Sequence, residues 1–362
     1  MQNKILSVKY CDAVVGRLAM TPDGLMAFEY DVEWLKNGFS ISPYKLPLQQ
    51  RVFIANRAPF DGVFGVFNDS LPDNWGRLLV DRELLRHGIA PNSISPLDRL
   101  AIVGKNGPGA LEFEPSEELV REYRDSDLDV IAGEIRKIVD DRATVTPDAI
   151  SEELFRVGGS SGGTRPKILR RIDGQDWIIK FRAAVDPVDI GRREFDLMNL
   201  AARAGLDVPE HRLFNDKYFG VKRFDRTDSG DKVFMISAAG LLDADHNQPT
   251  LDYSDLLSLT AKLTRDMAQV EKMFRLMVFN VLINNTDDHA KNFAFLYDGK
   301  DWKLSPAFDL TQTIGNWEHA TSVNRKGIDI TGTDMLAVAH QVGMTERRAG
   351  EIMLEVKQAV DG

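Results

Sequence analysis

Two stretches decide the fold and chemistry of this chain: LINNTDDHAKNFAF at 282–295 and SPAFDL at 305–310. Within them, four residues separate Asp287 from Asn292, and Asp309 follows seventeen positions later. Protein kinases use the same Asp-x4-Asn spacing, followed by a metal-binding aspartate. There, one carboxylate accepts the proton of the attacking hydroxyl, while the asparagine and the later aspartate hold magnesium against the phosphates. The pattern predicts ATP-dependent phosphoryl transfer, with Asp287 as base and Asn292 and Asp309 as Mg²⁺ ligands.

The neighbours of Asp287 are open to more than one interpretation. A polar helix end that only turns the chain is the alternative to a catalytic loop, but it leaves the apolar FAFLY after Asn292 unexplained. Asp288 is expected to be a solvated neighbour, because only Asp287 satisfies the spacing. His289 and Lys291 are expected near ATP, although a histidine in such a loop is more often a hydrogen-bonded strut than a proton carrier.

An upstream lysine and glutamate extend the pattern. Lys180 lies in the apolar run DWIIKF (176–181), and Glu194 lies in a helical segment at 191–205. Kinases place a phosphate-neutralising lysine on a strand and a glutamate that orients it on the next helix. Lys180 is therefore a predicted ATP ligand and Glu194 its candidate partner; a solvated lysine at a strand edge is the alternative.

A glycine- and serine-rich loop at 157–167 precedes that strand. It lacks the Gly-Lys-Ser/Thr ending of a Walker loop, and a flexible linker is one interpretation. Its position between two apolar segments favours a backbone that wraps phosphate groups. The residues expected to bind ATP here are Gly159, Ser160, Ser161, Gly162 and Gly163. The two serine hydroxyls are also candidate phosphorylation sites, and Lys167 adds either a second positive charge or a surface ion pair.

Composition limits the class of protein. The chain has 362 residues, enough for two domains, and a net charge of −10, which lacks the basic footprint of a protein that binds nucleic acid unaided. Its single cysteine, Cys11, allows no internal disulfide. No signal-peptide core or membrane-spanning run is present, so we expect a cytoplasmic protein without membrane contact.

The periodicities predict an α+β fold with two lobes, a β-rich N-terminal lobe and a helical C-terminal lobe, in the order found in kinases. Helices are expected near 69–88 and 116–141, the second as an acidic surface helix. Helical spacing of apolar residues also predicts helices in LDYSDLLSLTAKL (251–263), VEKMFRLMVFNVLINN (270–285) and RAGEIMLEVKQAV (348–360). The predicted divisions are a β-rich then helical N-terminal domain at 1–112, a helical connector at 113–150, a lobe with the glycine-serine loop at 151–250 and a helical catalytic lobe at 251–362.

Several of these motifs together resemble the HipA family, the serine/threonine-kinase toxins of bacterial type II toxin–antitoxin modules. FNDSLPDNWGRLLVDREL resembles the family's N-terminal domain, and GGSSGGTRPK, WIIKF, VKRFDR, NTDDHAKNF and PAFDL resemble its kinase domain. The resemblance covers nearly the whole chain, which is shorter than full-length members, so a trimmed C-terminal helical region is expected.

The resemblance implies a bilobal fold similar to protein and phosphoinositide kinases. It also implies ATP and Mg²⁺ as cosubstrate and metal, with a hinge in which main-chain groups of Lys222 and Phe224 meet adenine. It implies inhibitory autophosphorylation of the loop, and the tandem Ser160 and Ser161 leave open which serine is modified. It also implies an aminoacyl-tRNA synthetase as protein substrate. The implied partner is a HipB-like DNA-binding antitoxin, through which DNA is contacted only indirectly.

Two other functions remain as alternatives. A largely non-catalytic corepressor subunit would fit the faint helix-turn-helix pattern around Gly343, for which a plain two-helix packing element is the simpler interpretation. A small-molecule kinase of the aminoglycoside or choline type shares the Asp-x4-Asn motif but does not call for the N-terminal domain.

Overall fold

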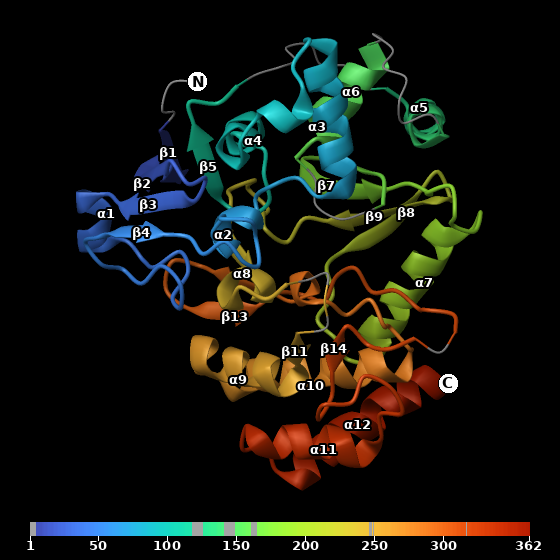
Figure 1. Cartoon of the computed structure of the whole chain (residues 1–362). Coiled ribbons are helices and arrows are strands. Elements are labelled where there is room, and N and C mark those ends of the chain that lie inside the picture. Colours follow the sequence, from blue (N-terminus) through green and yellow to red (C-terminus); the bar gives the residue numbers. More distant parts are fainter. Residues whose placement is uncertain are drawn as a thin grey trace. The chain divides into compact units, whose positions relative to one another are not determined.

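The computed structural model describes residues 5–117, 126–140, 149–160, 165–245, 248, 250–315 and 317–362. The chain forms two compact units, each with helices and β-sheet (Figure 1). The first contains Met1–Arg192 and Arg212–Phe234, and the second contains Arg193–His211 and Met235–Gly362. The fold is therefore α+β, as predicted, while the domain boundaries at 112, 150 and 250 stay predictions.

The first unit begins with a five-stranded antiparallel sheet of order β4-β3-β2-β1-β5. Its strands are β1 (Leu6–Tyr10), β2 (Ala13–Met20), β3 (Met26–Tyr30), β4 (Val52–Ile54) and β5 (Leu111–Glu114). Alternate residues such as Leu6 and Val8 in β1 are fully buried, because successive side chains leave opposite faces of a strand. The β-rich start predicted from the sequence is confirmed.

Short helices accompany this sheet. They are α1 (Val32–Asn37), α2 (Gly65–Asn68), α3 (Asn74–Arg86), the 3-10 turn η1 (Pro91–Ser93) and α4 (Pro96–Val103). The helix predicted within 69–88 is α3, and it ends just before Gly88, whose φ of +71° is the left-handed conformation that glycine adopts at low cost. Ser95 and Asp98 form a reciprocal capping box at the start of α4.

A four-stranded sheet of order β6-β7-β9-β8 forms the second part of the first unit. Its strands are β6 (Lys167–Ile172), β7 (Gln175–Lys180), β8 (His211–Phe214) and β9 (Tyr218–Lys222). Ile168, Trp177 and Ile179 belong to one buried cluster with residues of α3, α5 (Leu128–Asp140) and α6 (Ala149–Gly158). Figure 1 shows α3 and α6 side by side above this sheet.

The helix predicted from residue 116 begins later, and its character differs from the prediction. Residues 115–117 are not helical, residues 118–125 lie outside the described part of the chain, and α5 starts at Leu128. The Asp127 carboxylate accepts a hydrogen bond from the Asp129 N–H at 2.8 Å, which caps the first turn. The predicted surface helix is also wrong in part, because Ile131 and Ile135 are buried in the same cluster as residues of α3 and α6.

The second unit is mainly helical. Its helices are α7 (Ile190–Arg203, whose first turn precedes the division), α8 (Ala238–Leu242), α9 (Tyr253–Thr264), α10 (Met267–Leu282), η2 (Ala290–Asn292), α11 (Gly332–Gln341) and α12 (Glu346–Asp361). Its strands are β10 (Phe234–Ser237), β11 (Leu251–Asp252), β12 (Ala294–Tyr297), β13 (Trp302–Leu304) and β14 (Thr321–Ser322). The predicted helices α9, α10 and α12 are confirmed.

The helices α10, α11 and α12 pack together at the C-terminal end of the second unit (Figure 1). Two ion pairs join α10 to α12, from Arg348 to Glu271 at 2.8 Å and from Arg275 to Glu355 at 2.5 Å. Gly343 lies between α11 and α12 with φ +77°. The segment is thus a two-helix packing element of this unit. No helix in the described ranges has the length and apolar content needed to cross a membrane.

Candidate active site

The loop that follows α10 holds two neighbouring aspartates in opposite environments. Ile283 ends the helix, and Asn284 then adopts a left-handed conformation, φ +57°, that turns the chain. The side chain of Asp287 is 61% exposed, whereas Asp288 is 1% exposed. The exposed carboxylate is accessible to a substrate hydroxyl, and the buried one can serve only the protein itself.

Asp288 is the centre of a buried hydrogen-bond cluster. Its carboxylate accepts from the Tyr253 hydroxyl at 2.9 Å and from the Thr321 N–H at 3.2 Å, and the Nδ1 of His319 lies 3.0 Å from it. Burial, followed by the Asp288 charge, raises the pKa of Tyr253 well above its ordinary value, so the hydroxyl stays protonated as a donor. The expectation of a solvated neighbour is wrong: Asp288 is buried and holds this loop from the protein interior.

The same cluster continues to the segment after Asp309. The Asn280 amide donates to the Tyr253 hydroxyl at 2.9 Å, and the Asn285 amide donates to Asn280 Oδ1 at 3.0 Å. The Thr311 hydroxyl then donates to Asn285 Oδ1 at 3.0 Å. We call Tyr253, Asn280, Asn285, Asp288, Thr311 and His319 the loop-support network. It joins α9 and α10 to both segments that carry the predicted site residues.

Asn292 is held against the backbone of the predicted base. It ends the single turn η2, and its Nδ2 donates to the Asp287 carbonyl oxygen at 2.8 Å. No hydrogen bond to its Oδ1 occurs among the residues that the structure describes, so the amide oxygen is available as a ligand. His289 Nε2 lies 3.9 Å from Asp287 Oδ1, and Lys291 follows in η2; the contact of both with ATP stays a prediction.

The β12–β13 hairpin returns Asp309 to the same loop. Phe295 pairs with Leu304, and the Ser305 N–H donates to the Ala294 carbonyl at 2.9 Å, so the chain after Ser305 runs back toward Asn292. Asp309 then takes a left-handed conformation, φ +54°.

Two residues of the following segment bind the loop that leads to Asp287. The Thr313 N–H donates to the Asn284 carbonyl at 3.0 Å, and its hydroxyl accepts from that of Thr286 at 2.9 Å. Hydrogen bonds thus join the segment that follows Asp309 to the loop that carries Asp287 and Asn292, within the second unit.

In the first unit, the predicted phosphate-binding lysine has a second lysine opposite it. Lys180 on β7 and Lys167 on β6 are cross-strand partners, and they are 9% and 8% exposed. The Lys180 ammonium lies 5.7 Å from the centre of the Phe219 ring. Like charges facing each other across two strands repel, which favours an anion nearby. The alternative of a solvated Lys180 is wrong, and Lys167 does not lie at the surface, since both side chains are buried.

Of the five loop residues expected to bind ATP, the structure describes Gly159 and Ser160; Ser161, Gly162 and Gly163 lie outside the described residues. A Cβ at Gly159 would lie 2.4 Å from the Phe155 carbonyl oxygen, so only glycine fits this backbone position. Ser160 is 7% exposed, and its hydroxyl donates to the Asn106 carbonyl at 2.8 Å. A kinase would reach this hydroxyl only after the hydrogen bond opens.

The remaining predicted site residues are Lys222 and Phe224 of the hinge, and Glu194. Lys222 ends β9 opposite Trp177, and its ammonium pairs with Asp228 at 2.7 Å, so its main-chain groups rather than its side chain are suited to meet a ligand. Phe224 follows and is partly buried. Glu194 is 6% exposed and belongs to the second unit, whereas Lys180 belongs to the first.

Known protein families match both halves of this arrangement. Residues 159–362 match the HipA-like C-terminal domain, and residues 6–114 match the HipA N-terminal domain. The chain belongs to the HipA family. Its relatives therefore bear directly on the site just described.

Two relatives that align with this HipA-family chain over most of their length are named as kinases. The candidate kinase Y4mE of Sinorhizobium fredii is 28% identical over 347 residues, covering 87% of this chain and 78% of that protein. The serine/threonine-protein kinase toxin HipA of Shewanella oneidensis is 24% identical over 343 residues, covering 83% and 73%.

A solved structure, the Shewanella oneidensis toxin–antitoxin complex of HipA, HipB and operator DNA, shares the fold. It matches with a TM-score of 0.72 and 19% identity over 98% of this chain and 90% of that chain. The bilobal kinase-like fold predicted from the sequence is thereby confirmed. Sequence reasoning missed the supporting role of Asp288, Tyr253 and His319. The one local signal was the tandem Asp287-Asp288, which places one of two adjacent carboxylates on the inner side of the loop.

Proposed function

We propose that this chain is an ATP- and Mg²⁺-dependent serine/threonine-protein kinase and the toxin of a toxin–antitoxin module. The observation that carries the proposal is the loop cluster of the second unit. There, the exposed Asp287 carboxylate adjoins Asn292, which donates to its backbone, and the hairpin returns Asp309 to the same loop. The named kinases among its relatives support the same chemistry.

Asp287 is proposed as the general base. Its carboxylate is exposed, while its backbone is fixed by the Asn292 amide and by the burial of the next residue, Asp288. A serine or threonine hydroxyl that hydrogen-bonds to this carboxylate would be oriented for in-line attack and would give its proton to Asp287. The rigid support matters because misplacing a catalytic group by about 1 Å costs roughly a hundredfold in rate.

The donor atoms on this loop fit a magnesium site. Mg²⁺ is usually bound by one or two carboxylates together with water and substrate phosphate, so it needs no dedicated cage of protein ligands. Asp309 and the amide oxygen of Asn292 supply such a set, and no cluster of three or more His, Cys, Asp or Glu suited to a metal occurs within the described ranges. When bound, Mg²⁺ would neutralise phosphate charge, and Asn292 and Asp309 would hold it.

The first unit is proposed to bind the nucleotide. Lys180 would contact phosphate oxygens, and the backbone of Lys222 and Phe224 would meet adenine. The glycine-serine loop would lie against the phosphates and carry the autophosphorylated serine, Ser160 or Ser161. The buried Ser160 hydroxyl supports regulation by loop movement, because its bond to Asn106 must break before it reacts.

The protein partners follow from the family. The Shewanella complex contains HipA, HipB and operator DNA, so we propose a HipB-like antitoxin as partner, with DNA contacted through it. An aminoacyl-tRNA synthetase is the proposed protein substrate, and its phosphorylation would halt translation. These assignments rest on relatedness, while the catalytic assignment rests on the geometry of the loop.

Incubation with γ-labelled ATP and Mg²⁺, followed by mass spectrometry of labelled serines, tests the proposal. We expect autophosphorylation in the natural protein, its loss in Asp287→Asn, and its retention in Asp301→Asn, a carboxylate with the same 61% side-chain exposure outside the loop. Added cell lysate would identify the protein substrate. Label that passes only to sugars or amino alcohols would favour a small-molecule kinase, and no transfer at all would favour the corepressor alternative.

A further inference from the structure

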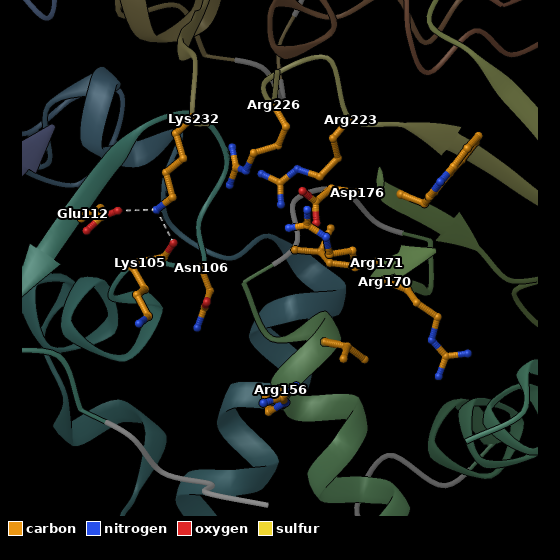
Figure 2. Close-up of a pocket in the computed structure, with 13 residues that line it drawn as sticks. Lys105, Asn106, Glu112, Arg156, Arg170, Arg171, Asp176, Arg223, Arg226 and Lys232 are labelled. Atoms are coloured by element: carbon orange, nitrogen blue, oxygen red, sulfur yellow. Dashed lines mark hydrogen bonds and ion pairs between the residues drawn. The ribbon is translucent and has the colours of Figure 1, made fainter. Parts of the chain in front are cut away.

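The first unit also contains a concave site that none of the residues discussed so far explains. It is a pocket of about 430 Å³ formed by β6, β7, the last turns of α6, the loop after α4 and the chain that follows β9 (Figure 2). All of its lining residues belong to the first unit, and none of them is among the residues assigned above to ATP or magnesium. The kinase assignment therefore does not account for this pocket.

The lining is strongly cationic in a chain that is acidic as a whole. Seven of the thirteen lining residues are lysine or arginine, and two, Glu112 and Asp176, are carboxylates. The chain itself carries a net charge of −10. Figure 2 shows the Arg170 guanidinium pointing away from the group, so six cations remain against two acids. Such a concentration of one sign in a concave site attracts the opposite charge.

Two arginines of the pocket share the hydrogen bonds of one buried carboxylate. Arg223 and Arg226 share one carboxylate, that of Asp225: Arg223 Nη2 lies 2.6 Å and Arg226 Nη1 lies 3.0 Å from the same Oδ2. Arg223 is only 8% exposed. The Asp176 carboxylate adds a second negative charge near both guanidinium groups, in a partly dehydrated place where charges interact strongly.

The surroundings of Lys232 also contain several positive charges. Its ammonium pairs with Glu112 at 2.6 Å and donates to the Lys105 carbonyl. Burial nevertheless lowers the pKa of Lys232, and the nearby Arg226 and Arg223 lower it further against the effect of Glu112. An anion between these side chains would remove that repulsion.

A neutral donor completes the lining. Trp177 is fully buried, and its indole Nε1 has no hydrogen-bond partner among the described residues. A buried donor left unmatched costs about 1–3 kcal/mol, so such groups usually have a partner. Trp177 and Lys180 lie three positions apart on β7, so their side chains leave opposite faces of the sheet. Lys180 itself is not among the residues that line the pocket.

We propose that this pocket binds a small polyphosphate-bearing anion at a site separate from the proposed ATP site. A pocket of about 430 Å³ exceeds the needs of one phosphate group and lies in the range of small-ligand sites. Guanidinium forks are suited to neighbouring phosphate oxygens, and several cations from separate segments favour an anion of more than one negative charge. The ligand would contact three segments: the loop after α4, the β6–β7 hairpin and the segment after β9.

Isothermal titration with inorganic triphosphate tests this site, without divalent metal and on phosphatase-treated protein, so that no loop phosphoserine competes. The test variant is Lys105→Glu/Arg171→Glu, because both side chains are exposed and line the pocket. The charge-matched control is Lys262→Glu/Lys300→Glu, in which both lysines are exposed in the second unit.

We expect the test variant to bind triphosphate at least about tenfold more weakly than the natural protein, and the control to change affinity by less than about twofold. Inorganic phosphate should bind more weakly than triphosphate, and the affinity should fall as salt is added. Equal weakening in both double variants, equal affinity for phosphate and triphosphate, or no binding at millimolar triphosphate would each overturn the proposal. Because no ATP turnover is measured, the result is independent of kinase activity.

Discussion

The contrast between the adjacent Asp287 and Asp288 gives the sharpest prediction. Replacing Asp288 with alanine removes the acceptor of Tyr253, His319 and Thr321, all of which are buried. Leaving a buried donor unmatched costs about 1–3 kcal/mol. Allowing for partial relaxation, the variant should lose on the order of 4 kcal/mol of local stability around the loop.

Asp287→Asn should behave in the opposite way. Its side chain is 61% exposed, and substitutions at such positions usually change the free energy of unfolding by less than about 0.5 kcal/mol. It should keep the loop intact and lose phosphate transfer, as proposed above. Asp287→Asn thus tests phosphate transfer with the loop intact, whereas Asp288→Ala disrupts the loop on which phosphate transfer depends.

Hydrogen exchange followed by mass spectrometry measures this contrast directly. A loss of about 4 kcal/mol corresponds to roughly a thousandfold loss of protection in peptides that cover 282–295. Asp287→Asn should leave these peptides within about threefold of the natural protein. Unchanged protection in Asp288→Ala, or an equal loss in both variants, would refute the role given to the loop-support network.

Three further predictions follow from individual groups. Although burial opposes its charge, the attraction of Arg223 lowers the pKa of Asp225 to about 2; its stabilising contribution, on the order of 2 kcal/mol, should be complete above pH 4 and lost as the pH falls toward 2, and acid unfolding of Asp225→Asn should lack this component. Lys180→Ala should raise the KM for ATP and lower kcat about a hundredfold or more in steady-state assays, and unchanged kinetics would exclude its contact with phosphate. Gly159→Ala should lower the thermal midpoint by several degrees, because a Cβ there meets the Phe155 carbonyl at 2.4 Å; an unchanged midpoint in calorimetry would contradict this packing.

Local sequence patterns predicted the elements well where one period dominated. The i, i+3, i+4 spacing of apolar residues located α9 and α10, and the short apolar run before Lys180 located β7. The Asp-x4-Asn spacing located the loop that contains η2, because contacts between neighbouring residues form such a single turn. In each case the interactions that define the element are local.

The remaining features depend on contacts between distant segments. Asp288 meets Tyr253 and His319 at separations of 35 and 31 residues, so no local pattern distinguishes it from a solvated aspartate. The same is true of the cationic pocket, whose lining is drawn from residues between Lys105 and Lys232. The burial of α5 escaped prediction because its buried isoleucines lie among acidic residues, a pattern that resembles a surface helix.

A crystal structure with Mg²⁺ and a non-hydrolysable ATP analogue would test the central claim most directly. We predict a magnesium ion about 2.1 Å from a carboxylate oxygen of Asp309 and from the Oδ1 of Asn292, with the Asp287 carboxylate facing the terminal phosphate. A nucleotide bound with its terminal phosphate far from this loop, or a metal that touches neither Asn292 nor Asp309, would contradict the account.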